Sequence, residues 1–191
     1  MSFVRVVDNV ASKEIFDLAS KHFQKSIWGL NNYSSVNDTN AGLGATDYCE
    51  EVNKLISENR FNESNILYNL WLEVNKKFNM EKNFKNELWK IHLNLGLPLT
   101  DQTIHQDDIM STFSKDMTIV YFLNETWHEN YGGELVVFDT SRTRITAGSF
   151  PVPNRACLFE SYLPHRGVTI SRICPIARIS IAFQCKYNNT L

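Results

Sequence analysis

The chain has 191 residues, of which 43% are hydrophobic and 12% are aromatic. This composition is typical of one folded domain with a sizeable core and excludes a disordered chain. The formal net charge of −2 gives no electrostatic footprint for binding nucleic acid or an anionic membrane surface. No stretch approaches the roughly 20 apolar residues of a membrane span, and residues 1–10 lack the long apolar core of a signal peptide.

The four cysteines are scattered along the chain at Cys49, Cys157, Cys174 and Cys185. None forms a Cys-x-x-Cys motif, which argues against a zinc ribbon or a thioredoxin-type centre. Cys157 and Cys185 lie in apolar runs and are typical of small buried side chains. This usage favours a reducing compartment, and we expect a cytoplasmic protein.

The N-terminal half is predicted to be mainly helical, after an edge strand at residues 3–7. Ser12 can cap a helix whose apolar stripe follows the i, i+3, i+4 spacing. The members of this stripe are Ile15, Leu18, Ala19, His22 and Phe23. Further helices are expected at residues 48–58 and 63–79, the second with one apolar face.

Residues 29–47 are rich in Asn, Ser, Gly and Thr and show little periodicity. The stretch is longer than an ordinary connection in a compact domain, and long loops are often lids or binding loops. A surface loop without a role and an active-site lid are equally compatible with the pattern.

After Lys90 the apolar periodicity changes to the alternation of β-strands. Short strands are expected at regular spacing, at residues 89–95, 103–107, 117–123, 134–138, 143–147, 156–160, 167–170 and 178–187. Such spacing favours a β-sandwich or barrel. We therefore predict a mainly β fold of the α+β class, a jelly roll (double-stranded β-helix) with N-terminal supporting helices. The domain is expected to comprise a helical support with a lid loop at 1–87 and a jelly-roll core at 88–187.

The strand at 103–107 carries His105-Gln106-Asp107. Residues i and i+2 of a strand point to the same face, so one imidazole and one carboxylate aim at a common point. These groups are two-thirds of a 2-His-1-carboxylate site, which leaves coordination positions open on Fe(II). Asp108 would point to the opposite face, so Asp107 is the better candidate ligand.

Two later stretches add candidate side chains. His165 lies at a turn-to-strand junction, where a jelly roll can bring it beside the His-x-Asp strand. Arg178 begins an apolar strand, and a buried arginine needs a carboxylate partner. Ser180 shares its strand face, and a planar guanidinium with one hydroxyl can bind a carboxylate well. Arg166 and Arg172 are the alternative arginines; we expect His92 and His128 to be structural or exposed.

The ordered set of His-x-Asp, a Gly-Gly-Glu-Leu strand, an Asn-Arg-Ala-Cys-Leu-Phe strand, a distal His and Arg-x-Ser resembles the Fe(II)/2-oxoglutarate-dependent oxygenases. The resemblance is greatest to their prolyl-hydroxylase-like branch and covers residues 89–186. A lone His-x-Asp occurs often by chance, whereas the whole set in this order, each on an expected strand, is specific.

The resemblance implies roles for these residues. His105, Asp107 and His165 would ligate Fe(II), and Arg178 with Ser180 would bind the C5 carboxylate of 2-oxoglutarate. O2 and a peptide or small-molecule substrate would complete a dioxygenase reaction. The reaction would hydroxylate an unactivated C–H bond and release succinate and CO2, with ascorbate as a candidate reductant. A prolyl residue or proline-like compound is the candidate substrate.

Three positions depart from the prolyl-hydroxylase pattern. Phe122 stands where a tyrosine often donates to the C5 carboxylate, and Leu95 and Gln102 stand where that branch has further tyrosines. These departures leave the metal chemistry intact and leave the substrate open. Two alternatives also remain open, a cupin-like metalloenzyme without 2-oxoglutarate and a non-catalytic jelly-roll binding module. The sequence does not indicate an oligomeric state.

Overall fold

The computed structural model describes residues 4–25, 28–32, 42–45, 52–78, 85–100, 102–107 and 116–188. Its helices are α1 (Lys13–Gln24), α2 (Val52–Ser57) and α3 (Ile66–Lys77), with a 3-10 helix at Glu129–Tyr131. Its strands are β1 (Val4–Val7), β2 (Trp28–Asn32), β3 (Gly42–Ala45), β4 (Lys85–Gly96), β5 (Met117–Phe122), β6 (Leu135–Phe138), β7 (Ile145–Ser149), β8 (Ala156–Glu160), β9 (His165–Gly167) and β10 (Arg178–Asn188).

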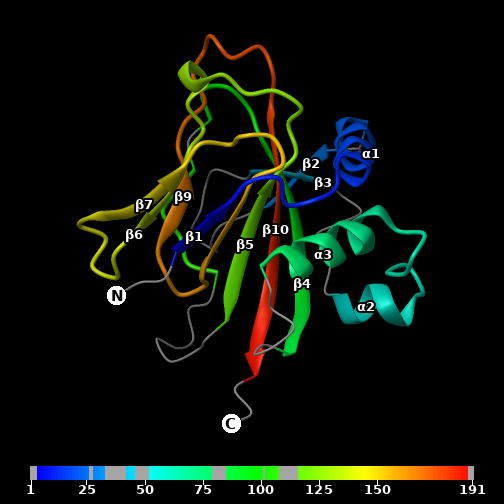
Figure 1. The fold of residues 1–191 in the computed structure, drawn as a ribbon. Coiled ribbons are helices and arrows are strands. Elements are labelled where there is room, and N and C mark those ends of the chain that lie inside the picture. The colour runs from blue at the N-terminus through cyan, green and yellow to red at the C-terminus, as the bar shows by residue number, and fades with distance from the viewer. Residues whose placement is uncertain are drawn as a thin grey trace.

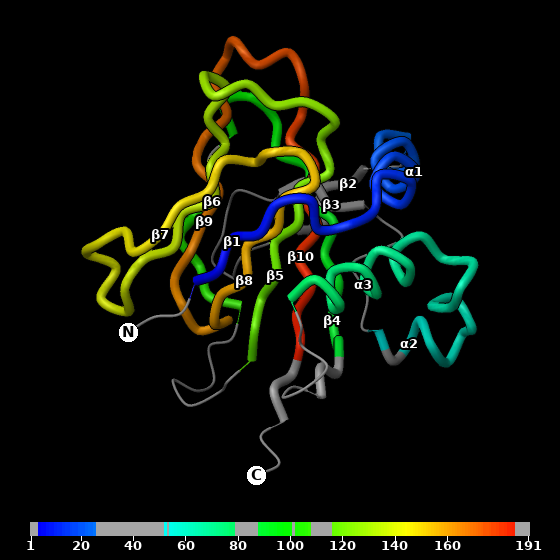
Figure 2. The backbone as a smooth tube through the Cα atoms, viewed as in Figure 1, coloured from blue at the N-terminus to red at the C-terminus, as the bar shows by residue number. Residues whose placement is uncertain are grey.

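Within the described ranges, the strands form two antiparallel sheets. The larger sheet has the order β1-β8-β5-β10-β4-β3-β2, and the smaller sheet has the order β7-β6-β9. The smaller sheet lies on one side of the larger sheet, and the helices lie on the other side (Figure 1). The tube view shows that β8, β5, β10 and β4 run side by side in the middle of the molecule (Figure 2). The larger sheet therefore has one face toward the helices and one toward the smaller sheet.

Strand β10 shows how one sequence serves both faces of the larger sheet. Ile179, Ile181 and Phe183 belong to the apolar cluster that includes the helices. Ala182 belongs to the second cluster, between the two sheets, together with Phe122 on β5. Because side chains alternate along a strand, the even-numbered residues of β10 face the smaller sheet, and Arg178 and Ser180 are among them.

Helix α3 packs against the larger sheet with the apolar face that its periodicity predicts. Leu67, Leu70, Trp71 and Val74 are buried, and the rings of Trp71 and Phe183 on β10 lie 5.4 Å apart. Burying such side chains stabilises the fold by about 1.5–3 kcal/mol each. The amide of Leu67 donates to the side chain of Asn65, which caps the helix. None of the helices in the described part of the chain is long and apolar enough to span a membrane.

Helix α1 begins where Ser12 predicts, because the Ser12 side chain accepts a hydrogen bond from the Ile15 amide. The predicted apolar stripe was wrong in part. Leu18 is 53% exposed, whereas Phe16 is buried with Ala19 and Phe23. Apolar residues lie on two adjacent stripes of α1, and packing against α3 buries the stripe that contains Phe16.

The stretch 29–47 is not one continuous loop. Strands β2 and β3 pair with each other, and β3 pairs with β4, so this stretch extends the edge of the larger sheet. The expectation of little regular structure was therefore wrong for 29–32 and 42–45, because backbone pairing with a sheet edge needs no apolar alternation. Residues 33–41 and 46–47, where the rest of the lid prediction falls, lie outside the described residues.

Candidate metal centre

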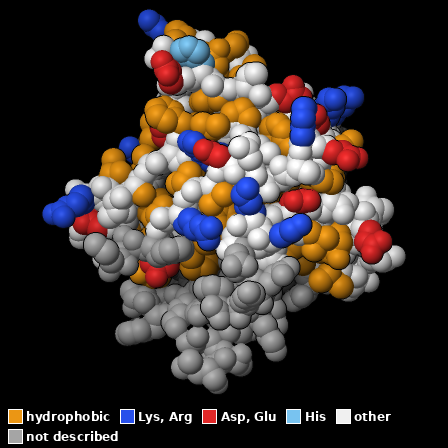
Figure 3. Space-filling view, viewed as in Figure 1, with side chains coloured by type: hydrophobic (Ala, Val, Ile, Leu, Met, Phe, Trp, Pro, Cys, Tyr) orange, Lys and Arg blue, Asp and Glu red, His pale blue; other side chains and the backbone are white. Residues whose placement is uncertain are grey.

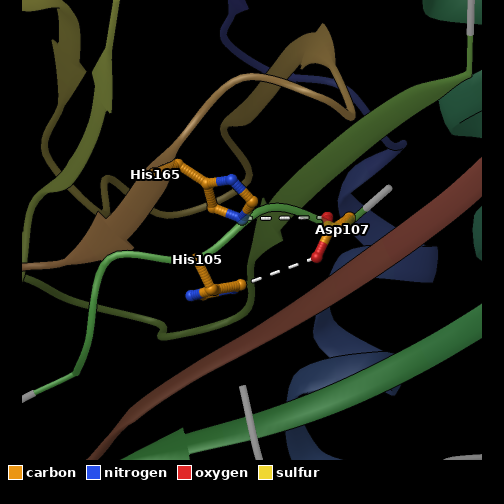
Figure 4. A group of neighbouring side chains, drawn as sticks. All are labelled: His105, Asp107 and His165. Carbon is orange, nitrogen blue, oxygen red and sulfur yellow. Dashed lines mark ion pairs between the residues drawn. The ribbon is translucent and has the colours of Figure 1, made fainter. Parts of the chain in front are cut away.

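The side chains of His105 and Asp107 converge with that of the distant His165 between the two sheets (Figure 4). Nε2 of His105 lies 3.9 Å from Oδ1 of Asp107, and Nε2 of His165 lies 3.7 Å from Oδ2 of Asp107. One donor atom from each residue can be chosen so that all three lie within 4.8 Å of one another. The structure thus brings together the three residues that the sequence singled out as candidate metal ligands.

The backbone places these three residues. His105 and His165 form an isolated antiparallel bridge, in which each amide donates to the other's carbonyl at 3.0 and 2.9 Å. The Asp107 amide donates to the carbonyl of Ser161 at 3.1 Å. The expected strand at 103–107 is therefore reduced to a single bridge, and the strand expected at 167–170 begins earlier, at His165.

Both histidines are oriented by their second ring nitrogen. Nδ1 of His105 lies 3.1 Å from the carbonyl of Thr103, and Nδ1 of His165 lies 3.0 Å from the carbonyl of Leu163. A carbonyl only accepts, so Nδ1 carries the proton in each ring. The lone pair is then on Nε2, which faces Asp107. This arrangement is the usual way in which a backbone carbonyl fixes the tautomer of a metal-binding histidine.

The carboxylate of Asp107 is held by a buried hydroxyl that the sequence reasoning did not identify. Thr118 on β5 donates to Oδ2 of Asp107 at 2.6 Å, and its hydroxyl lies 2.9 Å from that of Ser161. Burial works against ionisation of Asp107, but the neighbouring imidazoles and the Thr118 hydrogen bond outweigh it, so the carboxyl pKa is lowered. The one signal in the sequence was a hydroxyl in the otherwise apolar run 117–123.

The environment of His165 keeps its ring neutral. The ring packs against Phe159 at 4.7 Å and against His105 at 4.4 Å between centroids. Burial lowers the pKa of His165 below its ordinary value, although Asp107 opposes this effect. A neutral imidazole beside an ionised carboxylate is the protonation state that a divalent metal requires of its ligands.

Arg178 begins β10 and is 5% exposed. Its Nη1 donates to the carbonyl of Gly133 at 2.6 Å, while its buried Nε has no hydrogen-bond partner. Burial lowers the pKa of the guanidinium to about 10, opposed by the charge of Glu134, so Arg178 remains charged at neutral pH. Among the described residues no ion pair to Arg178 is present, so the carboxylate partner that the sequence led us to expect is not supplied by this part of the chain.

Two residues, Gly167 and Gln102, lie next to the guanidinium of Arg178. A methyl group on Gly167 would lie 2.5 Å from both Nη atoms of Arg178 and from Oε1 of Gln102. The Gly167 amide donates to Oε1 of Gln102 at 3.0 Å. Gly167 thus leaves room for the guanidinium, and Gln102 lies beside it.

Ser180 is buried two residues beyond Arg178, and its strand partners are Phe122 on β5 and Asn94 on β4. Leu95 points the other way, because it pairs with Ile179 and packs in the helix-side cluster. Leu95 therefore faces away from Ser180. The alternation of β4 puts Asn94 on the face of Ser180 instead.

His92 lies on the same face of β4, opposite Ala182, and is partly buried. Burial and the charge of Lys90 lower its pKa to about 4, with smaller influences from Asp107 and His105. The sequence reasoning treated His92 as structural or exposed and so missed its place beside the site. The alternation of side chains along a strand, which predicts the face of Ser180, also predicts that His92 shares the face of Asn94.

The competing residues are less well placed. Arg172 is exposed, and His128 is an exposed residue whose ring nitrogen accepts from the amide of Asn130. Arg166 lies between His165 and Gly167 on β9, so its side chain points to the opposite face of the strand. Asp108 lies outside the described residues.

Two loops of the described chain are held in place by contacts of their side chains. Arg142, between β6 and β7, donates to Oε1 of Gln106 at 3.3 Å, and Gln106 in turn donates to the carbonyl of Tyr162. Trp127 donates to the carbonyl of Gly132 and packs edge-on against Tyr131. These contacts fix the loops against the His-x-Asp segment and against themselves.

Comparison with known families identifies the region that holds these residues. Residues 99–184, which include the three converging side chains and Arg178, match the sequence profile described as the 2OG-Fe(II) oxygenase superfamily. The resemblance seen in the sequence is thereby confirmed. Among curated proteins, none matches the sequence significantly.

Solved structures of prolyl hydroxylases share the fold. One is a prolyl hydroxylase from Trichoplax adhaerens in complex with a hypoxia inducible factor oxygen degradation domain peptide fragment. It has a TM-score of 0.61 and 16% identity, and the match covers 96% of this chain and 83% of that one. Another is a prolyl-4-hydroxylase from Pseudomonas putida, with a TM-score of 0.57, 15% identity, and 99% and 95% coverage. The predicted jelly roll with supporting helices is confirmed.

The side chains present fit the groups that a 2OG-Fe(II) oxygenase uses. Two neutral imidazoles and one carboxylate are the donor set of an Fe(II) site with open positions. Bound donors around a first-row metal lie about 3 Å apart at metal–ligand distances near 2.1 Å, so the observed 3.7 and 3.9 Å require only small side-chain movements. The buried, incompletely bonded guanidinium of Arg178 fits the distal carboxylate of 2-oxoglutarate.

Proposed function

We propose that the protein is an Fe(II)- and 2-oxoglutarate-dependent dioxygenase that hydroxylates an unactivated C–H bond of a prolyl or proline-like substrate. The observation that carries the proposal is the combination of two features in the described part of the chain. His105, Asp107 and His165 converge on one point, and the charged Arg178 is buried with donor capacity to spare. A facial triad alone would also suit a cupin-like metalloenzyme, but that class has no use for the buried arginine.

In this proposal, Nε2 of each histidine and the carboxylate of Asp107 hold the metal. When bound, Fe(II) and 2-oxoglutarate supply the oxidising chemistry that turns O2 and a C–H bond into an alcohol with succinate and CO2. The Nδ1 hydrogen bonds of the histidines and the Thr118 hydroxyl keep the three donors aimed at one point. The protein contributes orientation, so little reorganisation is needed when the metal binds.

Arg178 is proposed to bind the C5 carboxylate of 2-oxoglutarate, with the Ser180 hydroxyl as second donor. A guanidinium buried without an ionic partner strongly favours an incoming carboxylate, because the ion pair offsets the desolvation that burial imposes. Phe122, which lies beside Ser180 in the sheet, has no donor to add. The neighbouring polar residues Asn94 and Gln102 are therefore the remaining candidates for a further contact.

The proposed substrate class rests on the structural neighbours and on charge. Both neighbours are prolyl hydroxylases, and one was solved with a peptide. On the face shown in Figure 3, acidic and basic side chains are interspersed over the described part of the surface. The described part of this face therefore has no large patch of one charge that would favour a highly charged substrate. A neutral prolyl peptide or a proline-like compound is consistent with both observations.

The test measures succinate released by the Fe(II)-loaded protein with 2-oxoglutarate in air, against a library of proline-containing peptides and free amino acids. We expect succinate that depends on Fe(II) and increases with a subset of the library. Arg178→Lys should raise the KM for 2-oxoglutarate at least tenfold, because lysine cannot form the bidentate contact. Arg172→Lys, at an exposed arginine, is the matched control and should leave KM unchanged.

Two results would contradict the proposal. The first is a wild-type protein that binds Fe(II) but releases no succinate with any member of the library. The second is an Arg178→Lys protein with an unchanged KM for 2-oxoglutarate. Metal binding of the lysine variant, followed by isothermal titration with Mn(II), distinguishes a specific loss of 2-oxoglutarate affinity from general misfolding.

A further inference from the structure

Ser161 directly follows β8 and is buried beside the candidate metal centre. Only 3% of this residue is exposed, and Thr118, on the neighbouring strand β5, is fully buried. The two hydroxyl oxygens lie 2.9 Å apart, and the Thr118 hydroxyl lies 2.6 Å from Oδ2 of Asp107. Three polar groups from three segments of the chain are thus connected in a row that ends at a proposed metal ligand.

The donor of each hydrogen bond in this row follows from the chemistry of its members. As a metal ligand, Asp107 must be ionised, and an ionised carboxylate only accepts, whereas a hydroxyl has one hydrogen to donate. The Thr118 hydrogen therefore points to Asp107, and Thr118 accepts the hydrogen of Ser161. Because a hydroxyl that accepts a hydrogen bond becomes a better donor, Ser161 strengthens the bond between Thr118 and the carboxylate.

Ser161 also holds the main chain of Asp107. Its carbonyl accepts a hydrogen bond from the Asp107 amide at 3.1 Å, and its own amide donates to the carbonyl of Asp116 at 2.8 Å. Ser161 is thus connected directly to the backbone of Asp107 and, through Thr118, to the carboxylate. Since Asp107 is held at both its backbone and its carboxylate, its side chain has little freedom to rotate.

The two carboxylate oxygens of Asp107 are left in different states. Oδ2 accepts the hydrogen bond from Thr118, whereas Oδ1 accepts none from the described residues. Oδ1 lies on the side of His105, 3.9 Å from its Nε2 (Figure 4). Oδ1 therefore keeps both of its lone pairs and is the oxygen better able to bind a cation.

We propose that Ser161 is a positioning residue of the metal site. Its hydroxyl acts through Thr118 to hold Oδ2 of Asp107, and this leaves Oδ1 for the metal. The inference rests on the proposed function, since it concerns the metal site of that function. A role of Ser161 in the backbone alone would need only its carbonyl and amide, which every side-chain variant keeps.

The test measures the dissociation constant for Mn(II) by isothermal titration in Ser161→Ala, Thr118→Val and the double variant. We expect Ser161→Ala to raise this constant about tenfold, the lower end of the usual loss when an outer hydrogen bond to a metal ligand is removed. Thr118→Val already lacks the contact with the carboxylate. Adding Ser161→Ala to Thr118→Val should therefore raise the constant no further, because the effects of residues in one network do not add.

A second measurement reports the geometry of the metal donors. Co(II) has visible absorption bands whose position and intensity depend on its ligands, and Ser161→Ala and Thr118→Val should change these bands in the same way. Ser20→Ala on α1 is the matched control, because this serine is also buried and its hydroxyl accepts a hydrogen bond from Gln24. The control should leave the Mn(II) affinity and the Co(II) spectrum unchanged.

Ser161→Cys provides a second variant of nearly the same shape, which tests the inference even if the alanine variant does not fold. A thiol is a weaker donor than a hydroxyl, so we expect a dissociation constant for Mn(II) between those of the wild type and Ser161→Ala. Circular dichroism of the metal-free variants checks that each is folded.

The outcomes distinguish this inference from the proposed function. A wild-type protein that binds no Mn(II) would contradict the proposed function and, with it, the inference. Unchanged Mn(II) affinity in folded Ser161→Ala and Ser161→Cys would overturn the role of Ser161 alone. Additive losses in the double variant would overturn it as well, because Ser161 would then act independently of Thr118.

Discussion

At the scale of single residues, the carboxylate of Asp107 depends on one buried hydroxyl. Thr118→Val keeps the shape of the side chain but removes the hydrogen bond to Oδ2. We expect the dissociation constant for Mn(II) to rise about 10–100-fold, which is the usual effect of losing a hydrogen bond that orients a ligand. Isothermal titration measures it, and Thr118→Ser, which restores the hydroxyl, is the control. Equal affinities of the valine and wild-type proteins would show that Thr118 does not position the ligand.

His92 makes the metal-free protein sensitive to acid. Its pKa is about 4 in the folded protein against an ordinary value of 6.5. Between these values the unfolded chain binds a proton that the folded chain does not, so the free energy of unfolding falls as the pH is lowered. Buried His165 shifts in the same direction and adds to the effect.

The variant His92→Gln isolates the contribution of this one imidazole. Urea denaturation at pH 7 and pH 5 should show a loss of stability on acidification that is smaller in the variant by about 1–2 kcal/mol. A chelator is present throughout, because metal binding would mask the effect. Parallel pH dependences in the two proteins would contradict the assignment.

At the scale of secondary structure elements, strand β9 serves both proposed ends of the cofactor site, with His165 at the metal and Gly167 under Arg178. Gly167→Ala would push against the tip of the Arg178 side chain. Because that tip is flexible, we expect little loss of stability but a displaced guanidinium, and hence a KM for 2-oxoglutarate at least tenfold higher. Gly148→Ala on β7, where a methyl group meets only ordinary contacts, is the matched control.

The turn before β8 ties the segment between β1 and α1 to the larger sheet. The side-chain amide of Asn154 donates to the Ala11 carbonyl and accepts hydrogen bonds from the Ala11 backbone amide and the Tyr121 hydroxyl. The backbone of Asn154 has a φ of 57°. Asn154→Ala should lower the free energy of unfolding by about 2–4 kcal/mol in urea denaturation. Asn154→Gly, which tolerates positive φ, should recover about 1 kcal/mol of this loss. Equal losses would show that the backbone conformation contributes nothing.

Elements with a single strong periodicity could be predicted from the sequence, and those with two competing patterns could not. The apolar face of α3 has one interpretation, whereas α1 has two adjacent apolar stripes, and its neighbours choose between them. For β4 the alternation was recognised, but the side facing the site depends on register and on a bulge, which are set by pairing with β10. The missed residues Asn94 and His92 both lie on this one strand.

At the scale of the whole molecule, metal and 2-oxoglutarate should stabilise the fold, because the three ligands come from segments that meet only in the folded chain. A ligand at 100 times its dissociation constant adds about 2.7 kcal/mol to the free energy of unfolding. Thermal denaturation with and without Mn(II) should show a rise in Tm. His105→Ala should abolish this rise, and His22→Ala on α1 should retain it. A rise that persists in His105→Ala would place the metal elsewhere.

The sequence was sufficient for the architecture and for the convergence of His105, Asp107 and His165, because strand order and alternation limit where such residues can meet. It was not sufficient for the surroundings of these residues. Thr118 lies on a strand with the sequence pattern of an apolar run, and its importance depends on its hydrogen bond to Asp107, which is eleven residues away. Contacts between strands that are distant in the sequence cannot be predicted from a short segment of the chain.

The isolated bridge between His105 and His165 has a consequence for how a metal would bind. Two reciprocal backbone hydrogen bonds join the histidines, which are 60 residues apart in the sequence. A metal ion takes no part in these bonds. Removal of a bound metal would therefore leave the two histidine backbones joined. We expect a metal to rebind without refolding of the segments that carry its proposed ligands.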